Sequence, residues 1–190
     1  MPQNKNFSWV RFILVVLGVI GVWKVFAVPL IPTSDVGLVF GFLHGFYLII
    51  HEAGHVLFSP RLLFFLPDHF GIQWMQLGGS AFQVMVPGIL AASAWLKGHK
   101  GSAALALMLT GGSLVDVSIY MVDSIPRVLP LLHDNQEGHD WYNLFSQWEI
   151  LHLSPKIAKF TWLLGRGVVL WGAIWCVLES LPDPKGTKIS

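Results

Sequence analysis

The sequence predicts an all-α integral membrane protein with about five transmembrane helices. Of its 190 residues, 54% are hydrophobic and only 12% are charged, about half the charged fraction of an ordinary soluble domain. The mean hydropathy is +0.60, and several apolar stretches approach the roughly 20 residues that a helix needs to cross a bilayer. We expect a single polytopic domain over residues 1–190, because the sequence contains no stretch typical of a separate soluble domain.

Each of five apolar stretches is a candidate transmembrane helix of this all-α protein. They cover residues 9–28, 36–58, 73–96, 102–121 and 156–178. The first is expected to remain as an uncleaved helix, because Trp23 and Lys24 interrupt the apolar core that a signal peptide needs. Lysines and arginines otherwise divide almost evenly between alternate loops, so Lys5 and Arg11 favour a cytoplasmic N-terminus only if the third stretch spans the membrane.

The connections between these stretches differ in character. Pro60 and Pro67 interrupt the apolar residues 59–70, which follow the second stretch and are predicted to form a short re-entrant or hairpin segment. Residues 122–140 make the longest polar loop. Residues 141–153 fit a short amphipathic helix.

Charge and cysteine content narrow the possible partners. The net charge is +1, so nothing indicates a nucleic-acid partner, and the expected partner surface is the lipid bilayer. Cys176 is the single cysteine of the chain, which excludes an intrachain disulfide.

The second apolar stretch contains polar, titratable side chains in the run LIIHEAGHVLF. On a helix, His51 and His55 lie one turn apart on one face, a spacing at which both imidazoles can bind a single zinc ion. Glu52 then lies beside the metal, where it can act as general base on a zinc-bound water whose pKa is lowered toward about 7. The pattern predicts a zinc site with His51 and His55 as ligands and Glu52 as the catalytic residue.

The membrane setting favours a functional role for this motif. An acidic side chain at the middle of a membrane helix costs about 2.5–3.5 kcal/mol, so intramembrane acids are functional candidates by default. The alternative interpretation is that His51, Glu52 and His55 form a polar cluster that only packs helices together.

Residues before the motif suggest how its helix is held. Gly37, Gly41 and Gly45 recur every four residues and predict a smooth ridge against which other helices pack. Such packing would keep the motif out of lipid. The alternative is that the three glycines only reflect the general richness of membrane helices in glycine. His44 lies seven residues before His51 on roughly the same face, and we expect it to line a cavity or pack rather than bind metal.

The His-Glu-Ala-Gly-His sequence within an apolar helix resembles the site-2 protease family of intramembrane zinc metallopeptidases. Gly78-Gly79-Ser80 is similar to the glycine-containing segment that follows the motif helix in many members. The resemblance implies that the family's zinc histidines correspond to His51 and His55, and its catalytic glutamate to Glu52. It also implies a multi-pass protein of the bacterial cytoplasmic membrane. The chain lacks the Leu-Asp-Gly motif and the Asn-Pro pair of most members, and looks more like a compact bacterial branch.

A catalytic zinc site needs a third protein ligand and an open position for water. Asp116 is a candidate because burying an acid in the fourth stretch is costly. Asp140 opens a helical pattern, where it also suits an N-cap, and its surroundings GHDWYNLF resemble a segment found late in compact family members. Asp140 is the preferred ligand, Asp116 is an alternate ligand or a hydrogen-bond partner of a metal-bound histidine, and His139 is a further alternative. The other downstream candidates are Asp123, His133 and Asp134.

Together these features predict a zinc metalloendopeptidase that hydrolyses a peptide bond in or near the membrane, in a membrane protein or a membrane-associated peptide. We expect residues 76–83 (QLGGSAFQ) to form either an extended edge that holds an unwound substrate by β-addition or a helix break made by glycines.

Other classes of function stay open: a divalent-metal transporter, a non-catalytic zinc-binding membrane scaffold, and a membrane zinc hydrolase acting on lipid amides. The transporter pattern has proline at the position of Gly54 and glutamate at that of Val56.

Overall fold

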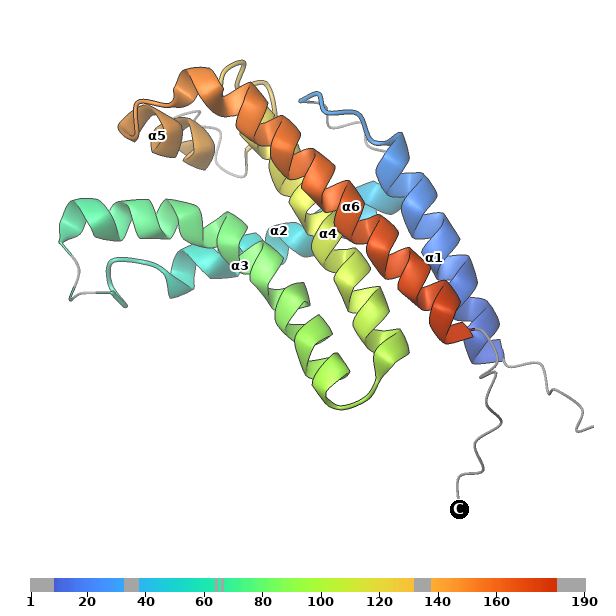
Figure 1. Cartoon of the computed structure of the whole chain (residues 1–190). Coiled ribbons are helices and arrows are strands. Elements are labelled where there is room, and N and C mark those ends of the chain that lie inside the picture. Colours follow the sequence, from blue (N-terminus) through green and yellow to red (C-terminus); the bar gives the residue numbers. More distant parts are fainter. Residues whose placement is uncertain (1–8, 33–37, 64, 66, 132–137, 181–190) are drawn as a thin grey trace, which may run out of the picture.

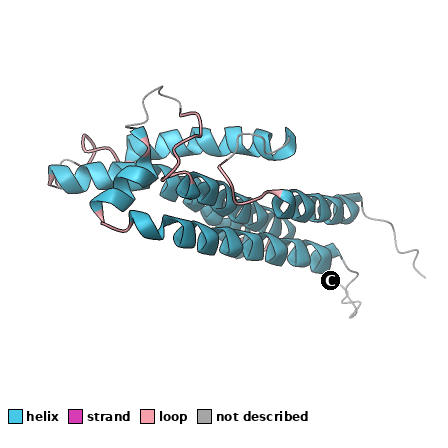
Figure 2. Cartoon of the chain, turned by 90° about the horizontal axis from the view of Figure 1, so that it is seen from above, coloured by secondary structure: helices cyan, strands magenta, loops and turns pink. Residues whose placement is uncertain are grey.

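All regular secondary structure in the described part of the chain is helical (Figures 1 and 2). The computed structural model describes residues 9–32, 38–63, 65, 67–131 and 138–180. In chain order the elements are α1 (Trp9–Ala27), α2 (Leu38–Leu57), α3 (Asp68–Leu96), α4 (Lys100–Val122), α5 (Asp140–Gln147), the 3-10 helix η2 (Leu151–Leu153) and α6 (Ser154–Ser180). The predicted all-α class is confirmed.

Several of these helices suit a lipid environment. Among the described residues, three helices are long and apolar enough to cross a membrane: Phe70–Leu96, Lys100–Val122 and Leu151–Ser180. Large apolar side chains remain exposed, for example Phe42 at 77% and Leu96 at 79%, as expected of surfaces that face lipid rather than water. The chain is a membrane protein. Helices α1 and α2 have 19 and 20 residues, and a total of five spans stays a prediction.

Helices α4 and α6 form the centre of the bundle, with α1 alongside α6 (Figure 1). Their backbones approach closely where glycines face each other, because a Cβ atom on Gly111 would lie 2.6 Å from the carbonyl oxygen of Gly165. Small residues at such a crossing allow tight van der Waals packing, a main attraction between helices in lipid. The core between these helices consists of Val25, Val28, Ala104, Met108, Val115, Ile119, Val169, Ala173 and Cys176.

A proline interrupts the hydrogen bonding of α3 without ending the helix. Pro87 lies inside α3 and has no N–H to donate to the carbonyl oxygen of Gln83, one turn earlier. The Ser113 hydroxyl of α4 donates to that oxygen instead, at 3.0 Å. Figure 1 shows α3 bent partway along its length, as expected where a proline removes a helical hydrogen bond. The substitute hydrogen bond holds α3 against α4 at Gln83.

Helix α2 packs closely on α3 at the motif and not along the predicted glycine ridge. A Cβ atom on Gly54 would lie 2.4 Å from the carbonyl oxygen of Gly78, so the two helices can approach this closely only without a side chain there. A Cβ atom on Gly41 or Gly45, in contrast, would meet nothing within 4 Å. The ridge prediction is therefore wrong for these two glycines, and Gly37 lies outside the described residues.

The chain after the motif helix α2 has no extended edge and no helix break over residues 76–83, and it turns back on α2 as a hairpin. Residues 76–83 are helical and lie within α3, so both interpretations of that segment, an extended edge and a helix break, are wrong. The glycines there serve the helix crossing instead. The described residues between α2 and α3 form turns and irregular backbone, which join the two helices as a hairpin.

Candidate metal centre

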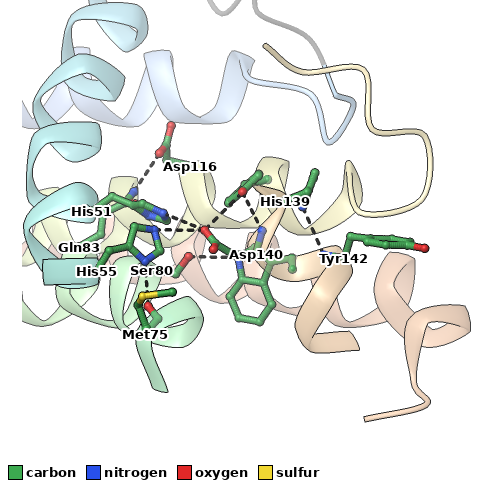
Figure 3. Close-up of polar contacts among 11 residues, drawn as sticks. His51, His55, Met75, Ser80, Gln83, Asp116, His139, Asp140 and Tyr142 are labelled. Carbon is green, nitrogen blue, oxygen red and sulfur yellow. Dashed lines mark hydrogen bonds and ion pairs between the residues drawn. The ribbon is translucent and has the colours of Figure 1, made fainter. Parts of the chain in front are cut away.

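The two motif histidines converge on one carboxylate (Figure 3). Helix α2 places the rings of His51 and His55 4.7 Å apart, centroid to centroid. Oδ2 of Asp140, from the start of α5, lies 3.3 Å from Nε2 of His51 and 3.2 Å from Nε2 of His55. His51 and Asp140 are buried, at 6% and 9% exposure, and the side chain of His55 is 21% exposed.

The contacts of the Nδ1 atoms of His51 and His55 show which nitrogen of each ring carries the hydrogen. Nδ1 of His55 lies 2.8 Å from the carbonyl oxygen of Met75, which can only accept, so Nδ1 carries the hydrogen. Nδ1 of His51 lies 3.1 Å from Oε1 of Gln83 and likewise donates. In the neutral rings, both Nε2 atoms therefore present lone pairs toward Asp140.

This arrangement suits a cation. Two imidazole nitrogens and one carboxylate oxygen face each other, and a positive charge, supplied by a ring proton or by a bound metal ion, holds such groups together. In a tetrahedral zinc site with bonds of 2.0–2.1 Å, neighbouring ligand atoms are about 3.3–3.4 Å apart. The observed separations of 3.3 and 3.2 Å from the carboxylate oxygen match that spacing, so the residues fit a metal ion.

Glu52 lies near this cluster. Ligand atoms of His51, Glu52 and His55 all lie within 4.8 Å of one another, which makes these three a possible metal-binding group. Asp140 contacts both histidines at 3.2 and 3.3 Å, so each of the two carboxylates could complete a set of three donors with the imidazoles. Glu52 is only partly buried.

His139 anchors Asp140 to the start of α5. It is the N-cap residue, and its Nδ1 accepts from the backbone N–H of Tyr142 at 3.2 Å, while its Nε2 donates to Oδ2 of Asp123 at 3.3 Å. Burial lowers the pKa of His139 despite the neighbouring Asp123, which keeps the ring neutral and able to accept at Nδ1. The N-cap expected at Asp140 is thus one residue earlier, and His139 supports the centre rather than joining it.

Tyr120 of α4 also holds Asp140, and the sequence analysis did not include it. Its hydroxyl accepts from the backbone N–H of Asp140 at 3.0 Å and donates to Oδ2 at 3.3 Å. The ring stacks on His139, with centroids 4.4 Å apart. A usable signal was present, because Asp116, Tyr120 and Asp123 recur at helical spacing on one face of α4.

The ionisation of Asp140 reflects its neighbours. Burial alone would raise the pKa of this carboxyl, but hydrogen bonds from the imidazole rings of His51 and His55, which act when Nε2 carries a proton, outweigh burial and hold its pKa below the usual range. Asp140 is therefore an ionised carboxylate, the form that binds metal.

The remaining candidates lie elsewhere. Asp116 does not contact the histidine pair; its Oδ1 is 2.8 Å from Nδ1 of His44, and its Oδ2 accepts from Gln83 at 2.8 Å. His44 is half exposed, with 51% of its side chain accessible. Asp123 is fully buried and accepts from the backbone N–H groups of Val128 and Leu129. His133 and Asp134 lie outside the described residues.

Helix α5 is tied to α3 as well as to α4. Nε1 of Trp141 donates to the Ser80 hydroxyl at 3.0 Å, and Gln147 bonds to Gln73 and Gln76 at the other end of the helix.

Comparison of the chain with protein-family models, with curated proteins and with solved structures finds no match. What the site can do follows from its donor atoms and their surroundings.

Proposed function

We propose that the chain is an intramembrane zinc hydrolase that cleaves peptide bonds in or near the lipid bilayer. The observation that carries this proposal is the meeting of two imidazole nitrogens and a carboxylate oxygen, at 3.2 and 3.3 Å, beside the glutamate of a His-Glu-x-x-His motif. Nitrogen and oxygen donors in this number and spacing suit zinc with one position left open.

Each residue has a defined task in this proposal. His51, His55 and Asp140 hold the metal, which when bound would polarise a scissile carbonyl and acidify a water molecule. Glu52 accepts the proton of the attacking water at a carboxylate oxygen and then donates it to the leaving amine. Its partial exposure leaves it accessible from outside the helix bundle.

The resemblance to site-2 proteases supports this choice among zinc enzymes. The Asp140 ligand would then come from the short helix α5 and not from a Leu-Asp-Gly motif on a membrane helix. The apolar, exposed helix surfaces favour a substrate that is itself membrane-embedded or membrane-associated. We further propose the bacterial cytoplasmic membrane as its location.

The Glu52→Gln variant tests the proposal. Wild-type protein and variant would be reconstituted in liposomes with a membrane-inserted reporter peptide, and new peptide termini would be detected by mass spectrometry. We expect cleavage by the wild type, loss of at least about 100-fold in the variant, and an unchanged metal content in both. A Glu52→Gln variant that still cleaves at the wild-type rate, or that loses its metal, would contradict the assigned role.

The same preparation separates the other classes. A divalent-metal transporter would move metal ions into the liposomes in both the wild type and a cleavage-deficient variant. A scaffold would bind metal without cleaving in either form. Cleavage that depends on Glu52 is expected of neither class.

A further inference from the structure

We propose that Gln83 is a positioning residue that fixes the metal-binding tautomer of His51, and that Asp116 fixes the orientation of Gln83. This inference rests on the proposed metal site. It assigns a role to two residues that do not touch the ligand atoms at the centre, and it explains why a membrane helix retains an acid at position 116.

The donor and acceptor atoms of the chain admit one arrangement. A carboxylate can only accept hydrogen bonds, so the Gln83 atom 2.8 Å from Oδ2 of Asp116 is the amide nitrogen. The amide oxygen must then face His51, where it lies 3.1 Å from Nδ1. His51 therefore carries its hydrogen on Nδ1 and keeps its Nε2 lone pair for the metal.

His44 completes the chain of hydrogen bonds on the far side. Its Nδ1 lies 2.8 Å from Oδ1 of Asp116, and because the carboxylate cannot donate, His44 must donate. Asp116 thus accepts from both neighbours, and it is the residue that sets the polarity of the whole series from His44 to His51.

Gln83 is held rigidly enough for this task. It is buried, at 3% exposure, and Ser113, whose hydroxyl bonds to its backbone carbonyl, is fully buried. The proline at position 87 frees that carbonyl oxygen for the bond with α4. Backbone and side chain of Gln83 are therefore both attached to α4, on which Asp116 lies.

Substitution of Asp116 by asparagine removes the group that forces the polarity, because an amide can donate as well as accept. With His44 still donating at Nδ1, the asparagine oxygen would face His44, and its amide group would donate toward Gln83. Gln83 would then turn its own amide nitrogen toward His51, which would have to accept at Nδ1 and carry its hydrogen on Nε2. That tautomer cannot bind the metal.

The test is metal affinity in the full chain purified in detergent. Zn²⁺ dissociation constants would be measured by competition with a chromophoric chelator, and Co²⁺ binding by its visible absorption bands. The variants are Gln83→Leu, Asp116→Asn, the double variant Gln83→Glu/Asp116→Asn, and His44→Phe as a control that leaves Asp116 accepting from Gln83.

We expect Gln83→Leu and Asp116→Asn each to weaken Zn²⁺ binding by about 10–100-fold and to alter the Co²⁺ spectrum. The double variant keeps the net charge of wild type. It also keeps the direction of the hydrogen bonds, because the glutamate introduced at position 83 accepts from His51 and the asparagine introduced at position 116 donates to that glutamate. It should bind within a few-fold of wild type, as should His44→Phe. This rescue also shows that Asp116→Asn loses affinity through polarity and not through misfolding.

Two results would overturn the inference: wild-type affinity in Gln83→Leu, or a double variant that binds no better than Asp116→Asn alone. A wild-type protein that binds neither Zn²⁺ nor Co²⁺ would overturn the proposed function itself, and the role of Gln83 would fall with it. Metal bound normally with no cleavage would overturn the proposed reaction and leave the role of Gln83 standing.

Discussion

Gly79 of α3 faces His51 of α2 across the metal centre: a Cβ atom on this glycine would lie 2.6 Å from Nε2 of the histidine. The same Cβ atom would lie 2.7 Å from Nε2 of His55. These contacts are shorter than van der Waals distance, and they fall on the two nitrogens that would bind the metal. Glycine at position 79 therefore keeps the space beside the ligand atoms free.

The Gly79→Ala variant is expected to lose most of its metal. The added methyl group must displace one or both imidazoles, and the three donor atoms then no longer meet. Zinc per chain, measured by elemental analysis after purification, should fall from about one to a small fraction. Gly41→Ala is the matched control, because its Cβ atom would meet nothing within 4 Å, and it should keep the wild-type zinc content.

Removal of the third donor distinguishes the two aspartates. Asp140→Ala deletes the oxygen that both histidines face, so we expect its zinc content to drop nearly to zero. Asp116→Ala leaves all three donor atoms and should still take up about one zinc ion per chain at saturating metal, with lower affinity. Zinc retained in Asp140→Ala and lost in Asp116→Ala would reverse the assignment.

The Tyr120→Phe variant tests the support of Asp140 from α4. It removes one hydroxyl that bonds both the backbone N–H and the side chain of Asp140. We expect roughly 10-fold weaker zinc binding and a lower thermal midpoint in detergent, since a buried N–H without a partner costs about 1–3 kcal/mol. Tyr142→Phe is the control, because it keeps the aromatic ring over which Arg127 lies. Equal effects of the two substitutions would argue against a specific role for Tyr120.

Ser113 and Pro87 should be coupled in stability. Ser113→Ala leaves the carbonyl oxygen of Gln83 without its donor, at a cost of about 1–3 kcal/mol. In the double variant Ser113→Ala/Pro87→Ala, residue 87 regains an N–H that can donate to the same oxygen. We expect the double variant to melt at a higher temperature than Ser113→Ala alone. A double variant that is less stable than both single variants would show that the proline matters for another reason.

Much of the local structure was predictable from the sequence because it depends on local rules. The apolar stretches and the prolines predicted most helix ends to within a few residues. The exceptions are α3, which begins at Asp68 and not at residue 73, and the predicted helix over 141–153, of which α5 ends at Gln147 and a 3-10 helix follows at Leu151–Leu153. The packing of glycines was not predictable in the same way. Gly41 and Gly45 have the spacing of a packing ridge, yet a Cβ atom on either would meet nothing within 4 Å, while α2 and α3 approach closely where Gly54 meets Gly78. Which glycine meets another helix depends on the crossing point, which spacing alone does not determine.

The sequence by itself determined the histidine pair and its glutamate, because a helical period places residues i and i+4 on one face whatever the rest of the chain does. Only the tertiary structure decided what completes them. Asp140 meets His51 across a sequence separation of 89 residues, and the roles of Tyr120, Gln83 and Asp116 follow from where α3, α4 and α5 pack around α2. Contacts between distant segments depend on how whole helices pack together, and no local pattern in the sequence specifies that packing.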